Sequence, residues 1–396
     1  MLDSFAAIVA PLGAEAFCRD YLGQRPLHLE GPPDKWQSVM SWDELNRLLG
    51  MTAIWSAHSL PMVLDKEPVP IASYCEPAVG RDGGQVLRPN PVKVQELLRK
   101  GATLVANDIE QLSPGLRAFA KSMEDQLGGK VQGNLYLSSK RRQGFRVHFD
   151  THDVFAVHTM GQKRWFVFEG RADAPIAHPM FKTLPQQHHE DAKGNLWKEI
   201  TLRAGDLLYL PRGQYHYALA EDGPCAHIAF GVTYPIGLDV ISHLFERMVA
   251  EPAARRNLPQ GDPVALQARL AELAERASAV IRDDTMRRTV DQILRTFRYP
   301  RPEYDLPTLI EAADDKWRVK ARGIRLVEAN GRAGLVREGS REAVEVPLAV
   351  KDEIAWIIGR AEFARSELAA AFAAASPGKL DKLLDDLRRM ALIDVA

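Results

Sequence analysis

Cysteine is scarce in this chain. Its three cysteines, Cys18, Cys75 and Cys225, are widely spaced, and no CxxC or Cys/His zinc spacing appears. A few cysteines of odd number exclude a disulfide framework and are typical of small buried apolar residues in a reducing compartment. We therefore expect a cytoplasmic protein.

Long apolar runs are missing as well. No stretch of about 20 apolar residues is available to span a bilayer, so we expect no membrane partner. The first residues, MLDSFAAIVAPLGAEAF, include Asp3 and lack a basic segment before their apolar part. This pattern predicts an amphipathic helix and not a signal peptide.

Neither sign of charge dominates. The 51 Lys and Arg residues against 52 Asp and Glu residues give a formal net charge of −1. This balance excludes a global basic field that would attract nucleic acid or an anionic membrane, so a charged partner must be met locally. Apolar residues are plentiful instead, at 46% of 396 residues, which suffices for two or three domains with sizeable cores.

Helix signals give way to strand signals at about residue 130. Before it, Ser41 begins a capping box, and Ser113-Pro114 opens a helix with apolar residues along one face. From there to about residue 235, short apolar or alternating segments are separated by Gly and Pro turns and end in CAHIAFGVTY. The pattern predicts a β barrel braced on one side by helices.

A His-x-Asp pair within the strand-rich part indicates a metal site. In RVHFD, His148 and Asp150 are two positions apart, so both point to one face of an extended strand. The segment GDLLYLPRGQYHYAL has a short buried strand between two turns and supplies His216 as a third ligand. Two imidazoles and one carboxylate are typical of non-haem iron(II), with positions left open for a co-substrate and dioxygen.

A rival ligand set exists on the same strand. His152 continues the alternation that begins with His148 and Asp150. The first and last of these residues would lie about 13 Å apart at roughly 3.3 Å per residue, which disfavours the rival set. We expect His152 at the rim of the site or behind its ligands.

Lys163 is a candidate for the same pocket. The segments Val154–Thr159 and Lys163–Phe168 have the pattern of two strands joined at Met160-Gly161-Gln162, which predicts a hairpin with apolar residues in the sheet interior. Most lysines are solvated. On an inward face, however, Lys163 would supply the compact positive charge that the far end of an iron-chelating dicarboxylate requires.

The last part of the chain is mostly helical. VALQARLAELAERASAVI and TMRRTVDQILRTF predict amphipathic helices, whose apolar stripe packs on the barrel of the same chain or on a partner. A proline-rich linker follows at about Arg301, then a hairpin turning at Asn330-Gly331 and helices starting at Ser366 and Ser376. These elements resemble a winged helix. Its last helix, KLDKLLDDLRRM, mixes acidic with basic residues, which favours a structural or protein-docking role over DNA binding.

Residues 101–170, from GATLVANDIE to KRWFVFEG, together with AGDLLYLPRGQYHYAL, resemble the cupin-type JmjC 2-oxoglutarate oxygenases known as ribosomal oxygenases. The resemblance implies that His148, Asp150 and His216 bind iron(II). It implies that Lys163, fifteen residues after the first histidine, binds the distal carboxylate of 2-oxoglutarate, and that Asn134 and Tyr136 line the co-substrate pocket. One position departs from the family pattern, because Arg146-Val147 precede the HxD where relatives often have Pro or Gly.

The resemblance also implies an architecture and an activity. The fold class would be α+β: a double-stranded β-helix core with flanking helices in residues 1–235 (barrel about 130–235), a helical dimerisation region in 236–300 and a winged-helix-like domain in 301–396. The activity would be hydroxylation of a side chain on a protein substrate, classically a ribosomal protein, by a homodimer that uses iron(II), 2-oxoglutarate and dioxygen. Asp153, Tyr215 and His227 are further pocket candidates, although a histidine in an apolar strand, such as His227, is more often a satisfied core residue.

Two other functions remain open from the sequence. One is an oxygenase that acts on RNA or a small metabolite, and the other is a cupin and winged-helix regulator without turnover. Acidic walls around the site would suit an Arg-rich or Lys-rich protein loop, whereas the basic run Lys140–Arg142 would suit phosphate.

Overall fold

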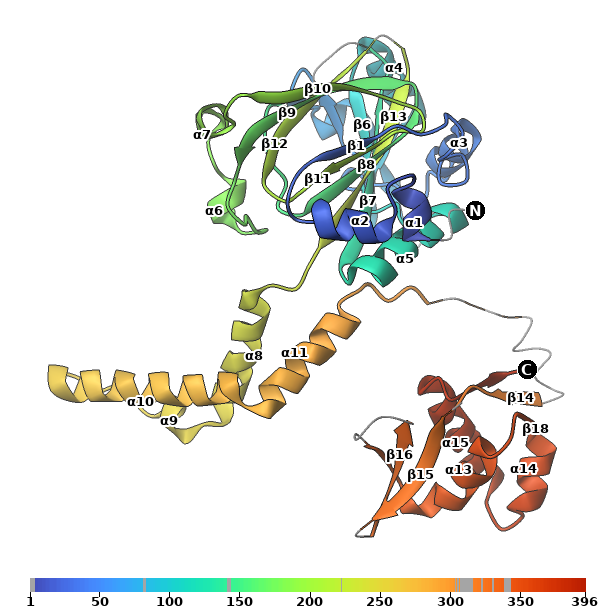
Figure 1. Cartoon of the computed structure of the whole chain (residues 1–396). Helices are drawn as coiled ribbons and strands as arrows, with labels where there is room; N and C mark the ends of the chain where they lie inside the picture. Colours follow the sequence, from blue (N-terminus) through green and yellow to red (C-terminus); the bar gives the residue numbers. More distant parts are fainter. Residues whose placement is uncertain are drawn as a thin grey trace. The chain divides into compact units, whose positions relative to one another are not determined.

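The chain divides into two compact units, Met1–Arg301 and Pro302–Ala396. The computed structural model describes residues 4–80, 83–140, 144–221, 223–302, 304, 306, 316–321, 323–329, 331–337 and 343–396. Figure 1 shows the sheets of the first unit with their flanking helices, followed by the helices α8 to α11. None of the described helices combines the length and apolarity that crossing a bilayer requires.

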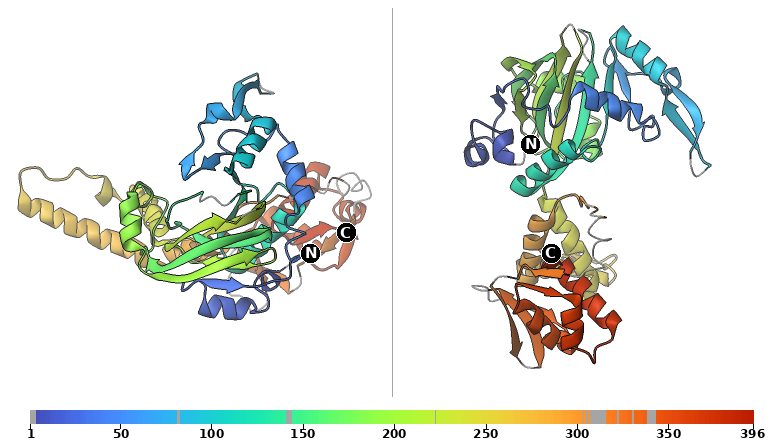
Figure 2. Two further views of the ribbon diagram at one scale, coloured as in Figure 1. Left: turned by 90° about the horizontal axis from the view of Figure 1, so that it is seen from above. Right: turned by 90° about the vertical axis from the view of Figure 1, so that its right-hand side faces the viewer.

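Two facing sheets form the barrel of the first unit. The larger sheet has eight strands in the order β1-β11-β8-β13-β7-β6-β2-β3, and the smaller has the order β10-β9-β12. The strands of the larger sheet are β1 (Leu27–Leu29), β2 (Met62–Leu64), β3 (Glu67–Pro68), β6 (Thr103–Ala106), β7 (Lys130–Ser138), β8 (Asp153–Met160), β11 (Leu207–Leu210) and β13 (Cys225–Thr233). Those of the smaller sheet are β9 (Gln162–Arg171), β10 (Leu196–Arg203) and β12 (Gln214–Ala220). A separate ribbon of β4 (Cys75–Val79) and β5 (Gln85–Pro89) stands away from the barrel (Figure 2).

The turn at Gly161 connects the two sheets. The strands predicted on either side of it are present as β8 and β9, but the predicted hairpin between them is wrong. β8 pairs with β11 and β13, whereas β9 pairs with β10 and β12. Gly161 has φ +68 and packs against the backbone of Pro224 and Cys225, so the chain turns a corner of the barrel here. A short turn joins two paired strands only when both strands belong to the same sheet. The sequence does not show that these two strands belong to different sheets.

Helices cover one face of the larger sheet. Those of the barrel region are α1 (Phe5–Ile8), α2 (Ala14–Asp20), α3 (Trp42–Gly50), α4 (Pro91–Lys100), α5 (Pro114–Leu127), α6 (Pro179–Lys182) and α7 (Gln186–Ala192), with a short 3₁₀ helix, η1 (Ile71–Ser73). The predicted starts at Ser41 and Ser113 are confirmed, because each hydroxyl accepts from the backbone N–H three residues later. The predicted N-terminal helix is divided into α1 and α2 around Pro11, which cannot donate to a helical hydrogen bond.

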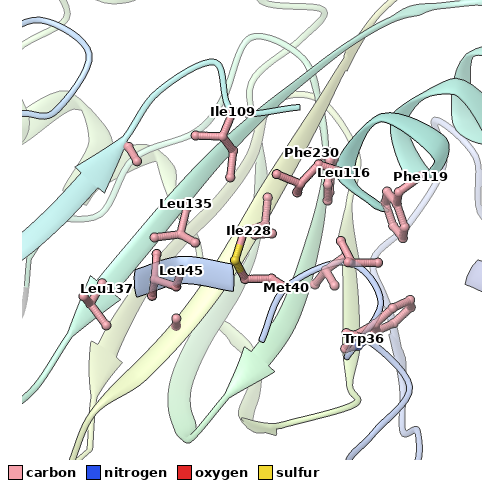
Figure 3. Packing of buried hydrophobic residues seen from close by; sticks show 14 of the residues in the cluster. Trp36, Met40, Leu45, Ile109, Leu116, Phe119, Leu135, Leu137, Ile228 and Phe230 are labelled. Carbon is pink, nitrogen blue, oxygen red and sulfur yellow. The ribbon is translucent and has the colours of Figure 1, made fainter. Parts of the chain in front are cut away.

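The alternation of side chains along β8 separates two cores. Phe155 and Val157 face the helices and join the large core, in which Phe119 of α5 stacks on Phe230 of β13 at 4.4 Å between ring centroids. Figure 3 shows this layer, with Leu116 near Phe230 and Trp36 near Phe119. Val154 and Ala156 face the barrel interior instead and pack against the smaller sheet. The face of β8 toward the helices therefore belongs to the hydrophobic core, and its other face lines the interior of the barrel.

A group of helices follows the barrel within the first unit. They are α8 (Gly237–Ala250), α9 (Pro252–Arg255), α10 (Pro263–Arg282) and α11 (Asp284–Thr296). The two predicted helices of this region are confirmed as α10 and α11. Their apolar stripe is only partly covered within the chain, since Val280 is buried but Leu270 is exposed. On α8, four apolar side chains on one face are also exposed: Leu238, Ile241, Phe245 and Val249.

The second unit has its own core. Its elements are β14 (Lys316–Val319), β15 (Ile324–Ala329), β16 (Arg332–Arg337), β17 (Ala343–Val346), η3 (Leu348–Val350), α13 (Lys351–Ile358), β18 (Glu362–Ala364), α14 (Arg365–Ala371), α15 (Pro377–Arg389) and β19 (Ile393–Val395). β15 and β16 form the predicted hairpin, with Gly331 at φ +71, while Asn330 lies outside the described residues. The helix start predicted at Ser376 is confirmed. The start predicted at Ser366 falls at Arg365, because Glu367 caps the backbone N–H of Ala364.

Substitution of Gly161 by alanine tests the corner between the sheets. A Cβ there would stand 2.3 Å from the Pro224 carbonyl oxygen on a backbone of positive φ. We expect Gly161→Ala to lower the free energy of unfolding by at least about 3 kcal/mol, from left-handed strain and overpacking together. Urea denaturation measures it. Gly223→Ala is the control, because that glycine has φ +109 but open space around its Cβ. Equal losses in both variants would show that the close contact contributes nothing.

Candidate functional site

A single antiparallel bridge joins two of the predicted metal ligands. His148 lies in a loop and not on the predicted extended strand, and its only ladder contact is with His216 of β12. The His148 N–H donates to the His216 carbonyl at 3.1 Å, and the His216 N–H donates to the His148 carbonyl at 2.9 Å. The ring centroids lie 4.5 Å apart. We predicted that His148 and Asp150 point to one face of an extended strand. Instead, the backbone of His148 pairs directly with that of His216.

Asp150 is brought to the same place by the turn before β12. Its carbonyl accepts from the Gly213 N–H at 2.9 Å, and its Oδ2 lies 3.5 Å from Nε2 of His216. One side-chain ligand atom from each of His148, Asp150 and His216 lies within 4.8 Å of the others, the only such group of three among the described residues. His152 lies elsewhere, over the backbone of Gly231. The rival set along one strand is therefore not assembled.

Both imidazoles are oriented for coordination through the same nitrogen. Nδ1 of His148 donates to the Arg146 carbonyl at 2.8 Å, and Nδ1 of His216 donates to the Gln214 carbonyl at 2.9 Å. Such bonds fix the tautomer and leave the Nε2 lone pair available to a metal. Burial and the neighbouring His148 lower the pKa of His216 to about 4, so its imidazole is neutral at physiological pH.

The carboxylate is ionised in this setting. Burial acts to raise the pKa of Asp150, but the imidazoles of His148 and His216 outweigh it and hold the pKa below its ordinary value. A divalent metal requires deprotonated ligands. Asp150 and His216 are thus matched to a metal in charge as well as in position.

An inner cavity of about 270 Å³ extends from these residues into the barrel. Its lining consists of Tyr136, Gly144, Phe145, His148, Asp150, Val154, Lys163, Trp165, His216, Ala218, His227 and Ala229. Lys163 is only 6% exposed, and its ammonium has no hydrogen-bond or ion-pair partner among the described residues. Burial lowers its pKa. An unpaired buried ammonium is costly, so the cavity favours an anion at this end.

Aromatic rings wall the inner cavity. Tyr136 of β7 stacks on His227 of β13 at 4.9 Å, and the edge of Trp165 meets His227 at 5.3 Å. Burial raises the pKa of Tyr136, so its hydroxyl stays protonated and can donate. Asn134 lies on the same face of β7 but outside the lining, where its Oδ1 accepts from the Asp108 N–H at 3.1 Å. Of the two β7 candidates, the structure brings only Tyr136 to the cavity.

The other pocket candidates have different positions. His227 lines the inner cavity, and its Nδ1 is buried without a partner among the described residues. Asp153 lies outside the cavity, where it accepts from the Tyr209 hydroxyl at 2.7 Å and from the Arg212 N–H at 2.8 Å. It thereby supports the turn that holds Asp150. Tyr215 also points outward, with its ring edge on Phe149 at 5.3 Å.

Sequence reasoning missed the segment of α6 and α7, between β9 and β10. Gln186 of α7 donates from Nε2 to the Val147 carbonyl at 3.0 Å, and the His189 ring packs on Phe149 at 5.4 Å. These contacts hold the loop that contains His148 and Asp150, which we call the ligand loop, in place against the barrel. The helices are short and polar, and only the paired histidines in QQHHED set the segment apart in sequence.

An outer cavity of about 810 Å³ lies on the opposite side of the ligands. It shares His148 and Asp150 with the inner cavity. The remaining lining residues are Gln132, Phe149, Thr151, His152, Ile176, Ala177, Phe181, Lys182, His189, Arg212, Thr233, Tyr234, Ile236, Asp239 and Phe297. Aromatic residues, histidines and two cations face a single carboxylate besides Asp150. The ligand set therefore stands between a small inner chamber and a larger outer one.

Comparison with known proteins identifies this core. The family model for the JmjC domain matches residues 108–240, which include the ligands and most of both cavity linings. The core is a JmjC domain. The predicted family resemblance and the cupin-type fold are thereby confirmed.

Curated relatives agree with the domain. Ribosomal oxygenase 2 of Bos taurus is 26% identical over 299 residues, which cover 70% of this chain and 59% of the relative. Ribosomal oxygenase 1 of Gallus gallus is 27% identical over 217 residues, 54% of this chain and 34% of the relative. The "Bifunctional lysine-specific demethylase and histidyl-hydroxylase NO66" of Dictyostelium discoideum is 25% identical over 219 residues, 54% of this chain and 40% of the relative. The chain thus matches between a third and three fifths of the length of these relatives.

A solved structure extends the likeness of the fold. E. coli ycfD aligns over 96% of this chain and 97% of its own, with 16% sequence identity and a TM-score of 0.51. This likeness shows a common fold.

A buried histidine beside Lys163 generates a prediction on pH. Burial and the Lys163 charge lower the pKa of His158 to about 4 from its ordinary 6.5. The unfolded chain then binds the extra proton between these values, so stability falls as pH drops from 6.5 to 4, by roughly 3 kcal/mol from this group. His158→Gln should flatten the pH dependence of urea unfolding by that amount. His243→Gln, at an exposed position on α8, is the control; parallel curves for all three proteins would contradict the assignment.

Proposed function

We propose that the protein is an iron(II)- and 2-oxoglutarate-dependent oxygenase that hydroxylates a side chain of a protein substrate, with a ribosomal protein as the expected target. The observation that carries the proposal is the position of the His148, Asp150 and His216 group between two cavities, with the Lys163 ammonium, which has no partner among the described residues, at the inner one. The names of the relatives support ribosomal proteins as the substrate class.

The residues present fit the implied metal and co-substrate. Two Nε2 atoms and one carboxylate oxygen on one side of an ion leave its other positions open, as iron(II) oxygenases require. We assign these roles to His148, His216 and Asp150. The inner cavity fits 2-oxoglutarate because it has the ligands at one end and a cation without a partner in the described structure at the other. Lys163 would pair the distal carboxylate, with the Tyr136 hydroxyl as a further donor.

The contribution of the protein is positioning and the exclusion of water. When bound, iron, 2-oxoglutarate and dioxygen together supply the oxidising power for hydroxylation of an aliphatic carbon, with succinate and carbon dioxide as products. The Arg146 and Gln214 carbonyls hold the two imidazoles in a single orientation, and Trp165 and His227 limit the inner cavity to a small molecule. The substrate side chain would then reach the ligands only from the outer cavity. For Asn134 the resemblance suggests contact with the co-substrate. Its hydrogen bond with the Asp108 N–H supports a different role, in which Asn134 holds β7 in position and so acts on the co-substrate only indirectly.

The outer cavity bears on the choice of substrate. Its walls are not acidic: Lys182 and Arg212 outnumber the one carboxylate of Asp239, which already caps the Ile236 N–H. This wall disfavours a charged lysine or arginine and favours a neutral side chain, presented by a protein loop. Lys140 lines neither cavity, and Arg141 and Arg142 lie outside the described residues. An RNA substrate is therefore second, supported by the two outer cations alone.

The remaining parts have supporting roles in the proposal. Residues 1–235 would be catalytic, 236–300 a helical dimerisation region and 301–396 a winged-helix domain. Exposed apolar side chains along α8, such as Phe245, support dimerisation. The hairpin β15–β16 beside α13, α14 and α15 supports the winged helix. The mixed charges of α15, including Asp381 and Asp385, favour protein docking over DNA.

Loss of a ligand tests the activity itself. Wild-type protein should bind iron(II) and 2-oxoglutarate without oxygen and, once oxygen is admitted, add the mass of one oxygen atom to a ribosomal protein. In His148→Ala and His216→Ala, metal affinity should fall by more than about 100-fold, beyond the loss caused by outer partners of metal ligands. Intact-mass spectrometry and metal titration measure both effects.

Each outcome of this test has a distinct meaning. Full turnover in either variant would contradict the assignment of the metal ligands. Binding and decarboxylation of 2-oxoglutarate without any modified ribosomal protein would direct the search to RNA or small molecules. No binding at all would favour a regulator without turnover.

Replacement of Lys163 separates co-substrate binding from folding. Lys163→Met removes a buried charge while keeping apolar volume, so the ligand-free protein should be at least as stable as wild type. Its 2-oxoglutarate requirement should rise roughly tenfold or more, as expected for loss of one charged hydrogen bond. Lys198→Met on β10, where the lysine is exposed, is the control in both thermal unfolding and 2-oxoglutarate titration. An unchanged requirement would remove Lys163 from the site.

A further inference from the structure

The helices α8 to α11 leave the barrel and return to it at one short turn. The exit is at Thr233 and Tyr234, directly after β13, and the return runs through residues 297–301. The exit lies against Gly129 and the end of α11 lies near Gly128, two adjacent residues between α5 and β7. A Cβ at Gly129 would meet the Thr233 carbonyl oxygen at 2.9 Å and Tyr234 Cδ1 at 3.2 Å, and one at Gly128 would lie 3.9 Å from the Leu294 carbonyl oxygen. The two ends of the helical group are therefore adjacent.

A buried ion pair fixes the return segment. Arg301 donates from Nε to Oε2 of Glu124 at 2.7 Å and from Nη2 to Oε1 at 2.9 Å, and the side chains are 4% and 2% exposed. Nη2 of Arg301 also donates to the Val131 carbonyl at 2.8 Å. Oε1 of Glu124 accepts from the N–H groups of Val131, at 3.1 Å, and Tyr299, at 3.3 Å. A bidentate pair with these further bonds joins α5, β7 and the return segment at one point.

The segments held in this way form a wall of the outer cavity. Phe297 from the return segment and Tyr234, Ile236 and Asp239 from the exit all line it. The Lys130 ammonium lies 4.5 Å from the Phe297 ring centroid and 5.5 Å from that of Tyr299, which fastens the return segment to the start of β7. No residue of the exit or return lines the inner cavity. The ion pair therefore supports a wall of the outer cavity and no wall of the inner cavity.

We propose that Glu124 and Arg301 are positioning residues for the substrate: their pairing sets the outer wall against which the protein substrate docks, and leaves co-substrate binding unaffected. The inference rests on the proposed function for the identity of the docked molecule. Buried ion pairs often contribute little net stability. A positioning role therefore predicts that loss of the pair changes binding at the outer cavity alone. A structural role predicts that both cavities are affected.

The chain offers a matched control three residues away. Arg298 pairs with Asp125 at 2.7 Å, again between the return segment and α5, but these side chains are 40% and 46% exposed. Exposed pairs are worth little. Arg298→Gln therefore removes an arginine from the same segment without opening a buried site, and Arg301→Gln removes the buried partner.

The experiment compares the full-length wild type with Arg301→Gln, Arg298→Gln and Phe297→Ala. Phe297→Ala removes part of the wall and leaves the ion pair in place, so it keeps the test valid if Arg301→Gln folds poorly. Three quantities are measured: amide exchange of residues 130–133, 233–239 and 297–301, the anaerobic affinity for 2-oxoglutarate in the presence of iron(II), and the KM for ribosomal protein hydroxylation. The probe for the last is intact ribosomal subunits.

The expected result is selective. In Arg301→Gln, exchange in residues 297–301 should rise roughly tenfold or more, as loss of one charged hydrogen bond implies. The KM for the subunits should rise by about tenfold in Arg301→Gln and Phe297→Ala, within the range that misplacement of a substrate produces. The 2-oxoglutarate affinity should stay within about twofold of wild type in every variant, well below the energy of one hydrogen bond. Arg298→Gln should match wild type throughout.

Three outcomes would overturn the proposal. Exchange in Arg301→Gln equal to that in Arg298→Gln would show that the pair fixes nothing. A loosened segment with an unchanged KM would leave it purely structural, and an equal loss of 2-oxoglutarate affinity would show that it acts on the whole barrel. If wild type hydroxylates no ribosomal protein, the proposed function fails on its own. The exchange at residues 233–239 and 297–301 then decides whether the pair holds the outer wall.

Discussion

The pairing of His148 with His216 is the contact on which the rest of the site depends. Two backbone hydrogen bonds join a loop residue to a strand of the smaller sheet, and they bring two imidazoles together. The Nδ1 bonds to backbone carbonyls then orient both rings. The backbone therefore sets both the position and the orientation of the two imidazoles. Asp150 completes it through Gly213, and Asp153 steadies the same turn through the Arg212 N–H.

Lys163 imposes the second constraint. A buried ammonium without a counterion in the described structure destabilises the empty barrel, and His158 and His227, whose pKa values it helps to lower, remain neutral around it. An anionic group that reaches Lys163 would remove this penalty. Under the proposed function, that group is the distal carboxylate of 2-oxoglutarate.

The sequence predicted the chemistry better than the geometry. Residue type and spacing were enough to select His148, Asp150, His216 and Lys163, and the fold brings all four to one cavity. The hairpin between β8 and β9 was wrong because a tight turn has the same sequence whether its strands pair or separate at a barrel corner. The ion pair of Glu124 with Arg301 joins residues 177 positions apart, and no local pattern records such a contact. The outer cavity could not be predicted for the same reason, since its lining residues are spread from Gln132 to Phe297.

The two cavities divide the tasks of the molecule between different parts of the chain. The inner one is lined by residues 136–229 alone, all of them within the JmjC domain. The outer one takes residues from the α6 and α7 segment and from both ends of the helical group. These helices therefore shape the outer cavity without lining the inner one. Of the described lining residues, only His148 and Asp150 border both cavities. Phe149, which lies between them in the chain, packs on the ring of His189, so the α7 helix supports the one loop that both cavities share.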